Sequence, residues 1–252
     1  MAAAPALPTP TPEEVPLSEG GRILNVFGAP KTAFLDLRRN ASWWAPFLLL
    51  SIATLGFFYT VDQKIGFRKV VENQIQQSPK ATERIGRLPP AQQSQAIDRQ
   101  VSGIRLFLYG YPAVILLWNL LIAGVMFVTF KFAASADLNF KISYAIVMYA
   151  SLPLLVKTVL ATASVAAGAN PDSFVLANPV ATNPGYFLSP AGSPFLYSLA
   201  SAADIFMIWT LILTAIGFAA VTKLKTSTTM AVVFAWYLAF SLGSAALAAM
   251  FS

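Results

Sequence analysis

The sequence predicts an all-α membrane protein with five transmembrane helices, an N-terminal juxtamembrane amphipathic helix and a partly helical loop on the outer side. Two observations predict this class. Hydrophobic residues make up 56% of the chain and charged residues only 11%, whereas an average soluble domain has about 25% charged residues. The sequence also contains five apolar runs long enough to cross a bilayer.

The chain has no cysteine and no histidine. This excludes disulfides, thiolate nucleophiles, Cys/His zinc sites and Ser-His or Cys-His catalytic pairs. The patterns GxxxxGKS/T, GxGxxG and HExxH are absent as well. We therefore expect no enzyme activity, no metal and no cofactor. The net charge of +6 is typical of basic residues beside membrane spans, so we expect no nucleic-acid partner.

Residues 1–20 are rich in proline and alanine and carry three acidic residues. They have neither the basic region nor the apolar region of a secretory signal peptide. We expect a disordered tail here, followed by a membrane domain over residues 21–252. The first hydrophobic helix would then direct insertion.

Residues 21–40 predict two short amphipathic pieces broken at Pro30. Their basic residues are candidates for contact with the lipid surface: Arg22, Lys31, Arg38 and Arg39. Two placements are open. In one, the pieces lie in the headgroup plane of an anionic leaflet. In the other, they pack across the cytoplasmic mouth of the bundle.

The five spans are expected at about residues 43–61, 106–130, 142–167, 198–221 and 228–251. Two of them contain a charge: Lys157 lies one turn after Pro153 in the third span, and Asp204 lies in the first third of the fourth. Each charge costs about 2.5–3.5 kcal/mol at the bilayer centre. Their estimated depths differ by less than the reach of a lysine, which favours an ion pair. The pair would be structural or part of a solute or proton pathway; alternatively, Lys157 snorkels outward and Asp204 bonds locally.

The fifth span carries small residues at a four-residue spacing, which permits close approach of a neighbouring helix. They are Ala231, Ala235, Ala239 and Gly243. We expect this stripe to contact another helix of the same chain. The alternative is a homo-oligomer formed through it.

Two connections have structure of their own. In the polar loop at residues 62–105, apolar residues at helical spacing and breaks at Pro79 and Pro89-Pro90 predict two short helices that cap the outer face. The cap would be a docking surface or only a scaffold between two spans. The loop at residues 168–197 has repeated Asn-Pro turns, and its apolar residues indicate that it folds against the bundle.

Basic residues set the orientation. They lie before the first span, between the second and third, and between the fourth and fifth, whereas residues 168–197 contain none. This predicts a cytoplasmic N-terminus and an outer C-terminus. The loop at 62–105 disagrees, because it would lie outside yet carries eight basic residues: Lys64, Arg68, Lys69, Lys80, Arg84, Arg87, Arg99 and Arg105.

Five segments, in order, carry a family resemblance: RILNVFGAPKTAFLDLRRNASWW, ENQIQQSPKATERIGRLPPAQQSQAI, FKISYAIVMYASLP, NPVATNPGYFL and DIFMIWTLILTAIGFAAVTK. With their spacing, the chain from about Gly21 to Phe251 resembles the Yip1 family of five-span membrane proteins, in its bacterial branch. The resemblance implies a cytosolic N-terminus, five spans and no catalytic site. Eukaryotic relatives are associated with Rab GTPases, vesicle traffic and the shaping of Golgi and endoplasmic-reticulum membranes. Bacterial relatives have no comparably settled role.

We therefore expect a non-enzymatic scaffold or membrane-organising protein in the bacterial cytoplasmic (inner) membrane. Its expected partners are the lipid bilayer, anionic lipids and other membrane proteins. The competing function is a small solute or proton transporter or channel that uses Lys157 and Asp204. A water-filled cavity that reaches both charges would favour transport, and a dry, packed centre would favour the scaffold.

Overall fold

The computed structural model describes residues 16–133 and 136–251, and this part of the chain forms helices and no strands. Residues 1–15, most of the tail for which we predict disorder, lie outside the described residues. The first two helices are α1 (Glu19–Gly28) and α2 (Pro30–Asp36). They are separated at Ala29, because a proline cannot continue a preceding helix without losing a hydrogen bond and clashing with the turn before it.

Within the described chain, five helical segments are long and apolar enough to cross a membrane. The first is α3 (Trp44–Lys64); the second is α7 (Tyr111–Val128) with η1 (Thr129–Ala133); the third is α8 (Phe140–Ala150) with α9 (Leu152–Ala166); the fourth is α11 (Ile205–Thr222); the fifth is α12 (Thr226–Phe251). The predicted class, an all-α protein with five apolar spanning helices, is confirmed.

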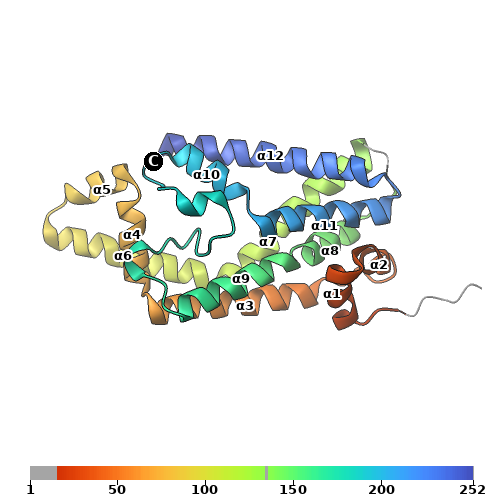
Figure 1. Cartoon of the computed structure of the whole chain (residues 1–252), viewed down its shortest axis with the longest axis horizontal. Helices are drawn as coiled ribbons and strands as arrows, with labels where there is room; N and C mark the ends of the chain where they lie inside the picture. Colours follow the sequence, from red (N-terminus) through yellow and green to blue (C-terminus); the bar gives the residue numbers. More distant parts are fainter. Residues whose placement is uncertain (1–15, 134–135, 252) are drawn as a thin grey trace, which may run out of the picture.

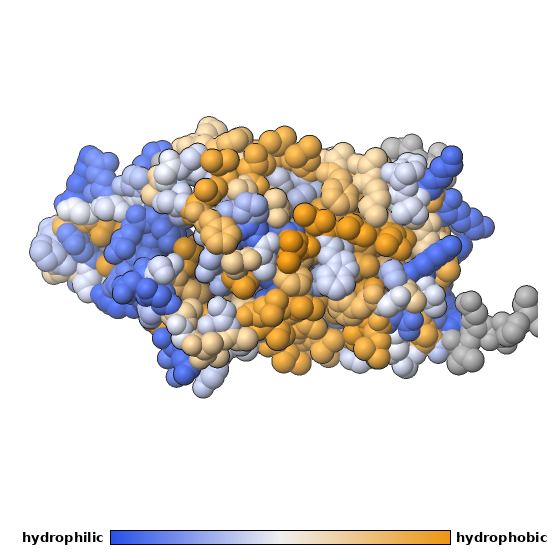
Figure 2. Space-filling view, in the orientation of Figure 1, coloured by the Kyte–Doolittle hydropathy of each residue, from blue (hydrophilic) through white to orange (hydrophobic). Residues whose placement is uncertain are grey.

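The spanning helices lie side by side along the long axis of the molecule (Figure 1). Helices α1 and α2 lie at one end, beside the turns that join α7 to α8 and α11 to α12. The helices of the polar insert lie at the opposite end. The surface between the two ends is largely hydrophobic, whereas hydrophilic residues gather at the ends (Figure 2). A bilayer would cover such a band.

The polar insert contains more helix than the sequence predicts. It consists of α4 (Phe67–Gln76), α5 (Pro79–Gly86) and the long helix α6 (Pro90–Tyr109). Pro79 and Pro90 each occupy the first turn of a helix, where a missing N–H is tolerated. An Arg68–Asp98 ion pair of 2.5 Å joins α4 to α6. Gly110 ends α6, so α7 begins at Tyr111 rather than near residue 106.

The fourth span also differs from its expected bounds. Residues 194–202 form a separate helix, α10 (Pro194–Ala202), which packs along α12, and α11 begins only at Ile205. Asp204 therefore lies at the N-cap of α11 and not inside a helix. An N-cap carboxylate accepts hydrogen bonds from the first free N–H groups of a helix, so the chain starts a new helix at this residue.

Two apolar clusters hold the helices together. The larger joins α2 to α7, α8, α11 and α12, and the smaller joins α3, α4, α6 and α9 to Phe174 of the loop after α9. Gly217 on α11 permits a close approach of α8 and α2 in the larger cluster. A Cβ there would lie 2.5 Å from Cγ2 of Ile146 and 3.1 Å from Cδ1 of Phe34.

Candidate functional site

The two charges predicted within the spans meet in the structure. Nζ of Lys157, on α9, is 2.7 Å from Oδ2 of Asp204. The Asp204 side chain is 4% exposed and that of Lys157 is 25% exposed. Because the two side chains pair, neither charge is left without a partner in an apolar environment, which would be costly.

The carboxylate of Asp204 is surrounded by further donors. Its Oδ1 accepts hydrogen bonds from the backbone N–H groups of Phe206 at 3.0 Å and Met207 at 3.2 Å, which caps α11. Its Oδ2 also accepts from the hydroxyl of Thr182 and, at 3.3 Å, from the amide of Asn183. A buried charge is tolerated when its lone pairs are satisfied in this way.

The loop after α9 supplies these partners because it folds tightly against α10. The side-chain amides of Asn178 and Asn183 hydrogen-bond to each other at 2.8 and 3.0 Å. Gly185 lies so close to Ser201 that a Cβ would be 2.1 Å from the Ser201 Oγ and 2.7 Å from its backbone nitrogen. Only glycine fits this position, so the Asn-Pro-Gly turn is fixed in place beside Asp204.

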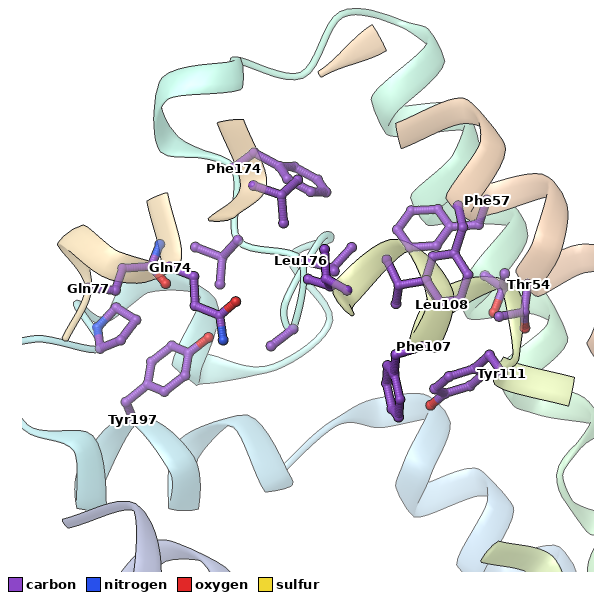
Figure 3. A pocket seen from close by; sticks show the side chains of 17 residues that line it. Thr54, Phe57, Gln74, Gln77, Phe107, Leu108, Tyr111, Phe174, Leu176 and Tyr197 are labelled. Atoms are coloured by element: carbon purple, nitrogen blue, oxygen red, sulfur yellow. The ribbon is translucent and has the colours of Figure 1, made fainter. Parts of the chain in front are cut away.

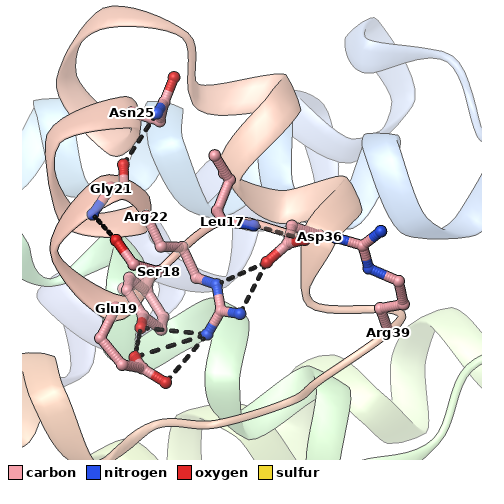
Figure 4. Close-up of polar contacts among 9 residues, drawn as sticks. Leu17, Ser18, Glu19, Gly21, Arg22, Asn25, Asp36 and Arg39 are labelled. Atoms are coloured by element: carbon pink, nitrogen blue, oxygen red, sulfur yellow. Dashed lines mark hydrogen bonds and ion pairs between the residues drawn. The ribbon is translucent and has the colours of Figure 1, made fainter. Parts of the chain in front are cut away.

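A second polar cluster lies at the α1–α2 end of the bundle (Figures 1 and 4). Arg22 is 2% exposed and donates from Nη2 and Nε to Oδ2 of Asp36, at 2.6 and 3.0 Å. Its Nη1 is 3.4 Å from Oε1 of Glu19 and 3.3 Å from the hydroxyl of Tyr149 on α8. The Tyr149 hydroxyl in turn donates a hydrogen bond to the carboxylate of Glu19. Arg39 pairs with the other oxygen of Asp36 at 2.6 Å.

This cluster shifts the pKa values of its charged groups. Burial alone would lower the pKa of Arg22, but hydrogen bonds to Asp36 and Tyr149 outweigh it, and the net shift is upward. Burial alone would raise the pKa of Asp36, but hydrogen bonds from Arg22, Arg39 and the backbone of Leu17 outweigh it, and the net shift is downward. Both groups therefore stay charged over a wider pH range than in an unfolded chain.

The prediction that Arg22 contacts the lipid surface is wrong, because its guanidinium is enclosed by α1, α2 and α8. The other three predicted contacts, Lys31, Arg38 and Arg39, are exposed. Val26, Phe34 and Leu37 are buried in the larger apolar cluster. Of the two placements left open, the structure thus has α1 and α2 packed across one end of the bundle.

The stripe on α12 faces outward. Its four predicted members are all exposed, namely Ala231, Ala235, Ala239 and Gly243. The expectation of an intrachain contact is wrong, since the residues of α12 that pack inside the protein are Thr229, Val233, Ser241 and Ala245. They are offset by two positions, which at 100° per residue is the opposite face of the helix.

A cavity of about 520 Å³ lies between the polar insert and the spans (Figure 3). Thr158 of α9 and Tyr197 of α10 line it, but Lys157 and Asp204 do not. Among the described residues, no group of three or more acidic side chains gathers as a metal site would require.

Sequence reasoning missed the partners that complete each polar cluster. Tyr149 and Glu19 are 130 positions apart, and no local pattern links them. Asp36 follows Arg22 by fourteen positions across the break at Pro30, so a hairpin of two short helices could have paired them. Thr182 lies in the loop whose turns are evident, although nothing in the sequence connects that loop to Asp204.

The chain matches the model of one protein family, described as Yip1 domain, over residues 24–248. No curated protein and no solved structure matches it.

Proposed function

The chain belongs to the Yip1 domain family, and from that premise we propose that it is a non-enzymatic scaffold or membrane-organising protein. It acts in the bacterial cytoplasmic membrane, and its N-terminus is cytoplasmic. Under the positive-inside rule, the exposed basic residues of the α1–α2 end support this orientation, and the basic residues of the polar insert at the opposite end count against it. Those of the α1–α2 end are Lys31, Arg38, Arg39, Lys131, Lys141, Lys223 and Lys225. Three of these residues precede α3 in the sequence and contact anionic lipids: Lys31, Arg38 and Arg39.

One observation carries the scaffold role: the carboxylate of the intramembrane ion pair is enclosed by protein donors. The carboxylate of Asp204 takes hydrogen bonds from four groups besides Lys157, and neither charge lines the 520 Å³ cavity. A group that carries protons or solutes needs contact with a water-filled path. The pair therefore supports a structural role, which leaves the polar ends of the molecule for partner proteins.

A transporter is the second candidate, and the helix break at Asp204 favours it. Transporters often bind ions and substrates where a discontinuous spanning helix exposes helix ends. Here α10 ends at Ala202, α11 begins at Ile205, and the ion pair lies at the break. Uptake that depends on Lys157 and Asp204 would support this function.

Site-specific photo-crosslinking in native membranes tests the scaffold role. A photoreactive amino acid replaces Arg84 in the exposed part of α5 or Lys31 at the other end, and Leu117 on the apolar surface of α7 serves as the control. We expect discrete protein adducts from at least one polar position and none from the control. If both polar positions give only the uncrosslinked chain at native expression levels, the protein does not gather partners through its ends.

A further inference from the structure

The cavity between the insert and the spans changes in character along its length. At one end its lining is mostly aromatic and aliphatic, from α3, α6 and α7: Phe57, Phe107, Leu108 and Tyr111, together with Thr54 (Figure 3). Phe174 and Leu176 of the loop after α9 lie between this end and the other. At the other end lie the amides of Gln74 and Gln77 and the ring of Tyr197 (Figure 3). The two ends therefore fit different parts of a ligand.

A second cavity, of about 380 Å³, adjoins the polar end. It shares Gln77 and Tyr197 with the first, and it adds the hydroxyl side chains of Ser198 and Ser201. The hydroxyl of Tyr197 is buried and has no hydrogen-bond partner of good geometry, although the side chains of Asn178 and Ser201 lie near enough to interact with it. Buried hydroxyls in native proteins nearly always have a partner, so this group is available to a ligand.

The residues that line both cavities include no Asp, Glu, Lys or Arg. A ligand with a charged head would leave that charge without a partner there, which is costly. The head group of a ligand that fits these cavities is therefore neutral and forms hydrogen bonds. A volume of about 520 Å³ lies within the range of about 300–1,000 Å³ that is usual for small-molecule sites.

The position of the cavity relative to the membrane indicates which way such a ligand points. Immediately after Arg105, the side chains of Leu106 and Phe107 are 78% and 54% exposed, which marks the level where α6 enters the apolar band. The aromatic end of the cavity lies at this level, and Gln74 and Gln77 belong to the polar insert. A lipid of this leaflet would have the same orientation, chain toward the membrane centre and head toward the insert.

We propose that this cavity and the one that adjoins it bind a neutral single-chain amphiphile, such as a monoacylglycerol, with its hydrocarbon chain against Phe57, Leu108 and Phe174 and its hydroxyl head at Gln77, Tyr197 and Ser198. The site is separate from the ion pair, and it does not depend on the scaffold role.

The test uses the full chain in phosphatidylcholine nanodiscs and a monoacylglycerol with a photoreactive group in its chain. We expect labelling to concentrate on peptides of α3 and α6, and excess unlabelled monoacylglycerol to reduce it at least tenfold. The corresponding fatty acid, ionised at pH 8, should compete at least tenfold more weakly. Labelling that is not competed, or that is equal on the outer surfaces of α7 and α12, would overturn the proposal. Equal competition by the fatty acid would also overturn it, because the site would not select a neutral head.

Two variants locate the site. Leu176→Trp fills the cavity and should reduce competed labelling at least fivefold, whereas Leu117→Trp, at a surface position that is 66% exposed, should leave it unchanged. Tyr197→Phe removes a single hydroxyl that has no well-formed hydrogen bond in the protein, and an unchanged Tm would show that the fold is intact. It should weaken competition by the monoacylglycerol about three- to tenfold, as expected for one lost hydrogen bond. If Tyr197→Phe and Leu176→Trp both bind as the wild type does, the ligand lies elsewhere.

Discussion

The guanidinium of Arg22 lies against Tyr149, although the two residues are 127 positions apart. Nη1 of Arg22 is 3.3 Å from the phenolic oxygen, and its Cζ is 5.5 Å from the ring centroid. Since Tyr149 is on α8 and Arg22 also binds Asp36, one side chain connects both N-terminal helices to the third span. Charge-assisted hydrogen bonds thus complement the apolar packing of Phe34 and Leu37.

Arg22→Met should destabilise the protein by about 3 kcal/mol. This is the lower end of the cost of breaking a buried ion pair, because Arg39 still binds the other oxygen of Asp36. Reversible unfolding in mixed micelles measures the change. The matched control is Arg38→Met, an exposed position at the same end, which should change stability by less than about 0.5 kcal/mol. Equal effects at the two positions would contradict the buried cluster.

Stability should also fall in acid through Asp36. Its pKa is lowered in the folded protein, so its contribution is complete above the unfolded value of about 3.9 and is lost as the pH falls through the lower, folded value. We expect the difference in Tm between the wild type and Asp36→Asn to be largest near pH 6 and to shrink below pH 4. A difference that stays constant down to pH 2.5 would show that the carboxylate is not held by Arg22 and Arg39.

Much of the fold follows from the sequence because the bilayer imposes strict demands. The spans are predictable from length and apolarity, and the meeting of Lys157 and Asp204 is predictable because each charge is costly alone. The burial of Arg22 is not, since an arginine in a short amphipathic segment is indistinguishable from a surface residue until its distant partners are known. The helix break at Asp204 depends likewise on Thr182 and Asn183, which reach it only in the folded chain.

The outward orientation of the α12 stripe has a similar explanation. Small residues allow a helix to approach closely, but lipid also accepts alanine and glycine, so the pattern does not tell a packed face from a lipid-facing one. The face that packs, with Thr229 and Ala245, contains a hydroxyl that donates to the backbone oxygen of Ala215 at 2.8 Å. That contact, which the sizes of the residues do not reveal, is one of those that hold this face of the helix against the bundle.

A matched pair of substitutions tests this rotation. Ala245→Leu adds three carbon atoms to a fully buried position and should cost about 1–3 kcal/mol through overpacking. Ala239→Leu adds the same atoms to an exposed position and should change stability by less than about 0.5 kcal/mol. Unfolding of both variants in the same micelles gives the comparison. The reverse order of the two costs would place the stripe inside the protein.

Reporter fusions test the proposed orientation. A reporter active only in the cytoplasm should be active when fused within residues 1–20 and silent when fused after Ser252, because five spans place the two ends on opposite sides. A fusion in α5, which the structure places opposite α1 and α2 (Figure 1), should also be silent despite the basic residues of the insert. Reporter activity at α5 together with silence at the N-terminus would show that the protein has the opposite orientation in the membrane.

Lys157 and Asp204 should be energetically coupled. Asp204 also caps α11, so replacing it with leucine would remove the cap together with the charge. Asp204→Asn keeps a capping side chain and removes only the charge. Lys157→Met and Asp204→Asn should each destabilise the protein, and the double variant should be more stable than the sum of the two costs predicts. For residues in direct contact, the expected coupling is about 0.5–3 kcal/mol. If the two changes in the free energy of unfolding are additive in micelles, the 2.7 Å contact contributes nothing to stability.

The same double variant separates the two candidate functions. If the pair is structural, a strain that carries only the double variant should grow and gather partners as the wild type does, because the packed centre is restored without charge. If the pair belongs to a transport path, stability would recover while uptake would not, since a proton or ion would have lost both of its binding groups. The enclosure of Asp204 by Thr182, Asn183 and the first turn of α11 leads us to expect the first result.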